Sequence, residues 1–373
     1  MLYDNRPWAD PHFPRPPFCG MVRALRHFPV DPSMTVPRKR AATIRDVAEA
    51  AQVSTATVSK FVNGNQRFTA EVEARIAQAV RHLGYSLNPM ARGMITGQTG
   101  NVGIVILDIR NPYFTSLVKG AARQAASAGL NLIIADAEES TAPELGVLQS
   151  LRRRVDGLIV SARLPAPAIE SLFDSGTPVV FYGRPSPYEK NHNVGCDNYA
   201  AALMLGRHLR ELGHRRISYL GFSGARWSFE RERGLKDAFK GVDAHFRTFD
   251  ATAPSAEEGE RLASTVLLSQ ELDDAIVAYN DLLAMGLLVE AKSLGIRVPE
   301  QVSVAGFDNL AYGRLVSPAL TSVDMMGEAT GELAMRKLVG VIKGQPSMHE
   351  DDVLQSRIVA RESTGPRRTR VND

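Results

Sequence analysis

The sequence predicts two α/β lobes, each a doubly wound parallel sheet, behind a small all-α helix-turn-helix domain. From Asn101 onward, short apolar runs alternate with helical stretches, as in βαβ units. Before that point, residues 43–83 contain three short amphipathic segments with helical spacing. A chain of 373 residues is long enough for two or three domains with their own cores.

The helical domain is predicted between Thr43 and Leu83. Thr43 can cap a first helix, and Asp46 three residues later gives a capping-box-like start. Ser54 caps a second helix, and a third helix from Thr69 closes the small core. Small polar side chains and a lysine on the outward face of the second helix suit a DNA major groove. The alternative is an ordinary Ser-capped helix pair of an α-protein.

Charge is distributed unevenly along the chain, whose overall net charge is +3. Residues 35–100 contain nine Lys or Arg and four Asp or Glu, whereas residues 101–373 have a net charge of −3. This asymmetry is expected when a small domain binds the phosphate backbone of nucleic acid and the large domain does not.

The overall composition, 44% apolar and 23% charged, is that of a soluble globular protein. No apolar run approaches the length of a membrane span, so we expect no membrane partner. Cys19 and Cys196 lie far apart without metal-ligand spacing, which fits a reducing cytoplasm. The sequence predicts neither a metal site nor a cofactor.

Residues 1–40 contain eight prolines and no periodicity. We expect a disordered extension, with Met34 as a candidate for the true start. A secretory signal is not expected because there is no continuous apolar region. The alternative is a genuine extension, and in either case the basic run Arg38-Lys39-Arg40 can contact DNA backbone.

Seven strands and several helices are predicted in the α/β region. The expected strands are Val102–Leu107, Leu130–Ala135, Gly157–Val160, Pro178–Tyr182, Ile217–Gly221, Ala275–Tyr279 and Val302–Gly306. The helices between them include Tyr199–Leu212, Ser255–Leu268 and Asp281–Leu294. Two sets of strands imply two lobes with helices on both faces of each sheet.

Several separate motifs, in this order, resemble the LacI (lactose repressor-like) family of bacterial transcriptional regulators. They are VSTATVSKFVNGN, NPMARGM, Asn111-Pro-Tyr-Phe after the first strand, Ser303-Val-Ala-Gly-Phe-Asp308 and Arg361-Glu-Ser-Thr364. The resemblance covers about residues 43–365. It implies a two-lobed periplasmic-binding-protein-like core with an N-terminal helix-turn-helix DNA-binding domain, the chain crossing between lobes near Asp197, Thr321 and Lys343.

The resemblance also implies domain limits. Residues 41–86 would form the DNA-binding domain, 87–100 a hinge helix and linker, 101–365 the effector-binding and dimerisation core, and 366–373 a tail. Asn88, Ala91 and Met94 match the hinge helix, with Met94 where the family has a leucine wedge for the minor groove. We expect this hinge to be disordered away from DNA; the alternative is a simple linker.

By the same resemblance, Thr55, Ala56 and Lys60 would read base edges. Lys60 can donate to guanine O6 or N7, while Ala56 offers only a methyl contact. A solvated surface lysine is the alternative. Gln52 stands where the turn prefers glycine, and a left-handed non-glycine residue costs about 1 kcal/mol. The other expected DNA contacts are Thr43, Ser54, Thr57, Ser59, Asn63, Arg67 and Thr69.

Effector contacts are predicted at strand ends, where ligands bind in such folds. By resemblance, Asp308 and Arg231 match the family's cleft aspartate and ligand-binding arginine, and Asn280 ends another strand. Arg and Asp suit a hydroxyl-rich ligand because both form bidentate hydrogen bonds. Tyr113 and Phe114 can stack on an apolar ligand face.

Each of these residues also has a structural interpretation. Asp308 and Arg231 can pair with each other, Asn280 can cap the following helix, and the aromatic pair can fill core. Tyr182 completes the predicted set, but Gly183 beside it departs from the acidic residue common in the family. Trp227 is a further stacking candidate.

We therefore predict a DNA-binding transcriptional regulator, most often a repressor in this family. It would act as a homodimer on a pseudo-palindromic operator, controlled by a small molecule such as a sugar. No Gly-rich phosphate loop follows a strand and no catalytic constellation is evident, so an enzyme is not expected. The main alternative is a solute-binding protein for sugar capture, which would have no use for residues 43–95.

Overall fold

A computed structural model describes residues 42–62, 66–85, 98–139, 141–161, 166–183, 193–269, 273–345 and 353–367. The chain divides into two compact units, 1–87 and 88–373.

The first unit holds three helices, α1 (Ile44–Ala51), α2 (Thr55–Val62) and α3 (Ala70–Leu83). Thr43 and Asp46 form the capping box at the start of α1, as predicted. Gln52 ends that helix with φ 53° and ψ 47°, which confirms the expected left-handed turn residue. The Ser54 side chain then accepts a hydrogen bond from the Thr57 N–H at 3.1 Å, which caps α2.

The core of this unit is small. Val47 and Ala51 of α1, Val58 of α2, and Ile76 and Ala79 of α3 are all buried. Since each helix supplies only a few buried side chains, none of the helices can be stable alone.

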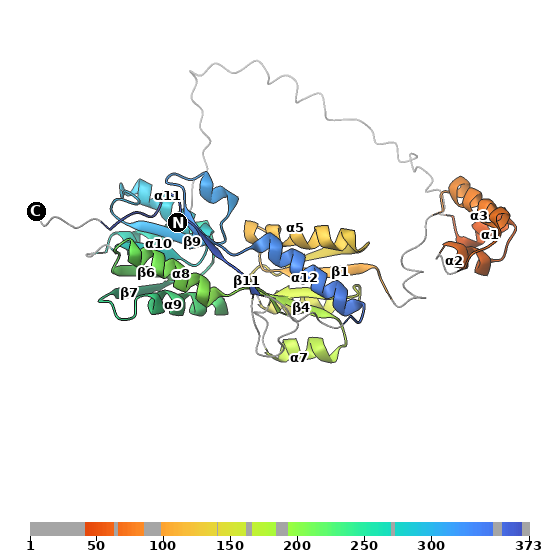
Figure 1. The fold of residues 1–373 in the computed structure, drawn as a ribbon, viewed down its shortest axis with the longest axis horizontal. Helices are drawn as coiled ribbons and strands as arrows, with labels where there is room; N and C mark the ends of the chain where they lie inside the picture. The colour runs from red at the N-terminus through yellow and green to blue at the C-terminus, as the bar shows by residue number, and fades with distance from the viewer. Residues whose placement is uncertain are drawn as a thin grey trace, which may run out of the picture. The chain divides into compact units, whose positions relative to one another are not determined.

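The first lobe of the second unit is built on a six-stranded sheet in the order β11-β5-β4-β3-β1-β2. Its strands are β1 (Asn101–Ile106), β2 (Asn131–Asp136), β3 (Leu158–Ser161), β4 (Val179–Tyr182), β5 (Asn193–Cys196) and β11 (Val353–Leu354). All neighbours in this sheet pair in parallel. Helices α5 (Pro112–Ser127) and α12 (Gly327–Ile342) cover one face, and α6 (Thr141–Leu151) and α7 (Ala166–Asp174) cover the other (Figure 1).

The second lobe has the strand order β12-β10-β9-β8-β6-β7. Its strands are β6 (Arg216–Gly221), β7 (His245–Asp250), β8 (Ala275–Ala278), β9 (Ser303–Phe307), β10 (Thr321–Asp324) and β12 (Arg357–Val359). Helices α8 (Asn198–Glu211) and α9 (Arg226–Ala238) cover one face, and α10 (Ala256–Leu267) and α11 (Asp281–Ser293) the other; a short 3-10 helix, η2, spans Ala311–Arg314.

All seven predicted strands are present within a residue or two, and two parallel sheets are confirmed. The expectation of wholly parallel sheets is wrong at one edge, because β12 runs antiparallel to β10. A strand that returns along the edge after the last crossing can pair in this direction without a further crossover helix.

The paired helices α5 and α12 lie in direct backbone contact. A side chain at Gly331 would overlap the Leu117 carbonyl oxygen, and one at Gly120 would overlap the Glu328 carbonyl oxygen. Glycine at both positions therefore allows the two helices to pack closely over the sheet.

The chain passes between the lobes three times. The first crossing is at Asp197, as predicted, and the second lies at residues 325–326, a few residues beyond the expected Thr321. The prediction of a third crossing near Lys343 is wrong. β11 still belongs to the first lobe and β12 to the second, so the chain crosses at residues 355–356. The physical reason is that the sheet gains one more edge strand after α12.

Candidate functional site

The outward face of α2 carries the predicted base-reading residues. Thr55, Ala56 and Lys60 are exposed, as is Ser54 before them. Val58 on the opposite side of the helix is fully buried, so it fixes which face points outward. Thr57 and Ser59 lie at the border and are partly buried. The helix thus presents small side chains and one cation to solvent.

The remaining predicted DNA contacts differ in surroundings. Arg67 is almost fully exposed and lies 3.9 Å from the Glu73 carboxylate. Thr69 is exposed beside the start of α3, whereas the Thr43 hydroxyl is engaged in the cap of α1. Asn63, Asn88, Ala91 and Met94 lie outside the described residues, as do nearly all of the predicted hinge and the extension at 1–40.

A cavity opens between the two lobes at the carboxyl ends of their strands. All six predicted effector residues line it: Tyr113, Phe114, Tyr182, Arg231, Asn280 and Asp308. The space between the lining side chains, including the part open to solvent, is about 500 Å³.

Arg231 is a buried residue of α9, in the second lobe. Its Nε donates to Asn198 Oδ1 at 2.9 Å, and Nη1 donates to the Tyr279 carbonyl oxygen. The guanidinium carbon lies 4.4 Å from the centre of the Phe307 ring, a cation–π contact. These contacts hold the guanidinium at the cavity wall, in place of the ion pair with Asp308 that was the alternative interpretation.

Asp308 follows β9 with φ 107°, a conformation that is unfavourable for a non-glycine residue. Burial raises the pKa of its carboxyl to about 7; the Arg231 guanidinium opposes this shift and the Asp324 carboxylate adds to it. Strained backbone and a shifted pKa in a cavity are both typical of functional positions.

Asn280 and Asp281 do cap and brace the fold. The Asn280 side chain accepts from the Leu283 N–H at 2.9 Å and donates to the Pro254 carbonyl at 2.9 Å. The capping interpretation is therefore correct for Asn280, although the residue also lines the cavity. Asp281 is fully buried behind it and points away from the cavity, toward Ser322 and Leu310.

The aromatic residues of the first lobe form a chain of edge contacts. The Tyr113 and Phe114 rings are 5.2 Å apart at 77°, and Phe114 and Tyr182 are 6.2 Å apart at 62°. Tyr182 is fully buried and donates to the Val105 carbonyl oxygen, and Phe114 is 4% exposed. Both therefore fill core as well as lining the cavity, while Tyr113 is only partly buried between the lobes.

Trp227 closes the cavity from the second lobe. Its indole N–H donates to the Tyr279 hydroxyl, and its ring occupies the space that a side chain at Gly183 would fill. Gly183 has φ 91°, so glycine is favoured there on two counts. The departure from the family pattern at this position is thus matched by an aromatic ring from the opposite lobe.

Sequence reasoning missed other lining residues: Asn111, Glu139, Cys196, Asn198, Pro254, Tyr279 and Met325. Glu139 follows a predicted strand, so the same strand-end rule could have found it. Cys196 ends β5, a four-residue strand that was not predicted, and Asn198 follows it. Burial raises the pKa of the Cys196 thiol to about 12, which favours the neutral thiol over the thiolate.

Two kinds of site are not seen. Among the described residues, no group of three or more His, Cys, Asp or Glu side chains is placed to hold a metal ion. Within the same ranges, no helix combines the length and apolar composition that crossing a membrane requires.

The sequence matches two family models. Residues 43–88 match bacterial regulatory proteins of the lacI family, and residues 207–364 match a periplasmic binding protein-like domain. The chain is also 30% identical to the ribose operon repressor of Bacillus subtilis (strain 168) over 307 residues, which are 82% of this chain and 93% of that protein.

Solved structures are similar over most of the chain. The lac repressor dimer bound to operator and the anti-inducer ONPF has a TM-score of 0.78 at 22% identity, covering 87% of this chain and 100% of that one. The transcriptional regulator CelR in complex with cellobiose has a TM-score of 0.62 at 26% identity, covering 86% and 99%.

A helix-turn-helix unit followed by a two-lobed core with an interlobe cavity defines a transcriptional regulator that binds DNA and responds to a small molecule. The chain belongs to the LacI family of bacterial regulatory proteins. Its relatives are transcriptional regulators, not enzymes. The sugar-capture alternative does not account for the matched DNA-binding segment.

Proposed function

We propose that the protein is a cytoplasmic repressor that binds a pseudo-palindromic operator as a homodimer and senses a sugar or related hydroxyl-rich metabolite. The observation that carries this proposal is one cavity lined by residues of both lobes, in a chain whose α2 presents an exposed polar face. Two relatives support a sugar as the effector: one is named a ribose operon repressor, and the other is a transcriptional regulator in complex with cellobiose.

In this proposal, residues 41–86 bind DNA and residues 101–365 bind effector and form the dimer. Thr55, Ala56 and Lys60 read base edges, and Ser54, Thr57, Ser59, Arg67 and Thr69 contact backbone or flanking groups. Two identical recognition helices require two half-sites, which is why the operator is expected to be nearly palindromic.

The mechanism is a coupling free energy between cavity and DNA-binding domain. Arg231 and Asn280 belong to the second lobe and Tyr113 to the first, so a ligand that contacts all three binds one lobe arrangement better than another. A change in lobe arrangement alters the spacing of the two DNA-binding domains of a dimer. Such couplings typically change affinity by roughly 5- to 150-fold.

The test is to select operator DNA from a random duplex pool with the full-length protein. The selected duplex is then titrated with and without ribose, cellobiose, galactose and nucleobases. We expect a two-fold symmetric consensus, two protomers per duplex by analytical ultracentrifugation, and at least one sugar that changes the affinity about fivefold or more. Equal binding to all sequences, with every compound, would overturn the proposal.

A further inference from the structure

Among the described residues, Gly183 is the one that lines the cavity directly after β4, and it brings no side chain. The Trp227 ring from α9 takes the space that a side chain would need. The Trp227 indole N–H is already used, because it donates to the Tyr279 hydroxyl. Among the described residues, this part of the wall therefore offers an aromatic face to a ligand.

A carboxylate reaches the cavity from a different strand end. Glu139 follows β2 and lines the same cavity from the first lobe. The backbone is in the left-handed conformation at both Glu138 and Glu139, with φ values of 50° and 55°. Two successive non-glycine residues in this region are unfavourable, so the surrounding structure must hold the turn in place.

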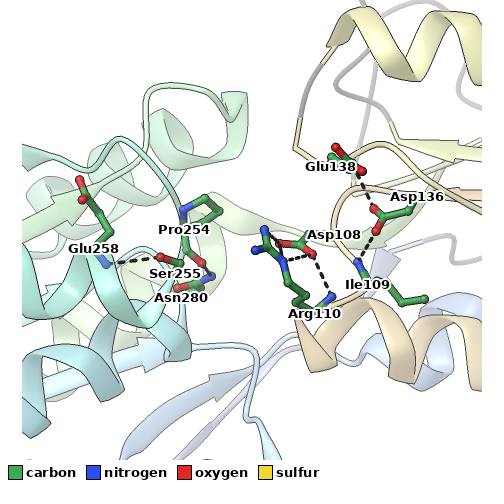
Figure 2. Close-up of polar contacts among 9 residues, drawn as sticks. All are labelled: Asp108, Ile109, Arg110, Asp136, Glu138, Pro254, Ser255, Glu258 and Asn280. Atoms are coloured by element: carbon green, nitrogen blue, oxygen red, sulfur yellow. Dashed lines mark hydrogen bonds and ion pairs between the residues drawn. The ribbon is translucent and has the colours of Figure 1, made fainter. Parts of the chain in front are cut away.

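The turn is held by Asp136, the last residue of β2. Its carboxylate accepts hydrogen bonds from the Glu138 N–H at 3.1 Å and the Ile109 N–H at 3.2 Å, as Figure 2 shows. The Glu139 N–H donates to the Leu107 carbonyl oxygen. These bonds tie the turn to the end of β1 and fix the position of the Glu139 backbone at the cavity.

Glu139 acts on the opposite lobe as well. Burial raises the pKa of the Tyr279 phenol above its ordinary range, and the Glu139 carboxylate contributes to the rise, while Arg231 opposes it. Tyr279 belongs to the second lobe and lines the same cavity as Glu139.

Two acids and one base are among the described residues that line the cavity: Glu139 and Asp308 are the acids, and Arg231 is the base. The Arg231 guanidinium is already hydrogen-bonded to Asn198 and Tyr279. Ionised carboxylates accept hydrogen bonds and repel anions, so the two acids favour a ligand that brings donors.

We propose that Glu139 is a specificity-determining residue of the effector site and that, together with Asp308, it selects an uncharged or amino sugar over a phosphorylated or acidic one. This inference depends on the proposed function of the cavity as the effector site.

The experiment uses the full-length protein with an equimolar pool of matched sugars. The pool contains glucose, galactose, ribose, cellobiose, glucosamine, galactosamine, glucuronate, glucose 6-phosphate and ribose 5-phosphate. Bound compounds are separated by ultrafiltration and measured by mass spectrometry, and the dissociation constant of the best-retained compound is then obtained by calorimetry. The variants are Glu139→Gln and, as a matched control, Glu138→Gln, whose exposed side chain lies in the same turn.

We expect the wild type to retain neutral or amino sugars at least tenfold over the anionic ones. Glu139→Gln should raise the dissociation constant of the best-retained sugar about tenfold and reduce the discrimination against anionic sugars. The melting temperature and the operator affinity should be unchanged. Glu138→Gln should behave as the wild type. Preferred retention of a phosphate or acid, or an unchanged ranking in Glu139→Gln, would overturn the inference while leaving the effector site itself in place. Retention of no pool member would overturn a sugar effector and this inference with it.

Discussion

The buried Asp281 carboxylate joins two segments of the second lobe: its Oδ1 accepts from the Ser322 hydroxyl and its Oδ2 from the Leu310 N–H, both at 2.7 Å. Burial raises the pKa of Asp281 well above its ordinary value, with Asp308 adding to the rise and these two donors opposing it. Asp281 therefore braces the segments on either side of Asp308, and it is not among the described residues that line the cavity.

Changing Asp281 to Ala should lower the free energy of unfolding of residues 88–373 by about 2–4 kcal/mol, because two buried donors lose their acceptor. Urea unfolding followed by circular dichroism measures the effect. The exposed Asp243 provides the control, since its change to Ala should stay within about 0.5 kcal/mol. A fully stable Asp281→Ala protein would show that the bracing interpretation is wrong.

The second prediction concerns the contact between α5 and α12. Gly331→Ala should cost about 1–3 kcal/mol, because the added methyl group overlaps the Leu117 carbonyl oxygen and the helices must separate. Gly340 lies on the same helix, where an added methyl group would be 3.8 Å from its nearest neighbour, so Gly340→Ala should stabilise by about 0.5–1 kcal/mol. Thermal unfolding of the two variants should shift in opposite directions; a shift of the same sign and size would contradict the packing argument.

How far the sequence predicts this fold depends on whether a strand carries a continuous apolar run. β1, β8 and β9 are buried along nearly all of their length and read as continuous apolar runs, so their prediction was straightforward. β7 is an edge strand that alternates partly buried and exposed residues, and β12 has three residues. Such strands are defined by pairing with a neighbour, which local sequence does not reveal.

The same contrast holds for the cavity. A strand-end rule together with the family resemblance led to Arg231, Asn280 and Asp308, because the position after a strand is visible in sequence. The contact of Trp227 with Gly183 joins residues from different lobes, and the left-handed turn at Glu139 depends on Asp136. Both follow from tertiary packing, so residue spacing could not predict them.

The third prediction tests the recognition face of α2. Lys60→Ala removes a donor for guanine and should relax selectivity at one position of each half-site by about 1–3 kcal/mol. Selection from a random duplex pool, followed by sequencing, measures it. Arg75→Ala removes the same charge from the exposed face of α3 and should leave the consensus unchanged. An identical consensus from Lys60→Ala and wild type would mean that Lys60 is only a solvated surface residue.

The fourth prediction concerns pH and follows from the pKa of about 7 at Asp308. If ligand hydroxyls donate to the ionised carboxylate, binding must compete with its proton. Below pH 7 the free protein holds that proton, so affinity should fall about tenfold for each pH unit; above pH 7 it should be constant. Calorimetric titration of the sugar identified by pool selection, between pH 5.5 and 8.5, measures this dependence.

Asp308→Asn isolates the effect, because the amide has nearly the same shape but does not titrate in this range. Its affinity should be lower at pH 8 and independent of pH, so the curves of the two proteins should approach each other at low pH. Operator binding without ligand should be unchanged, because Asp308 belongs to the unit of residues 88–373. The proposed DNA contacts of α2 lie in the other unit, residues 1–87. A pH dependence that persists in Asp308→Asn would assign the titration to another group.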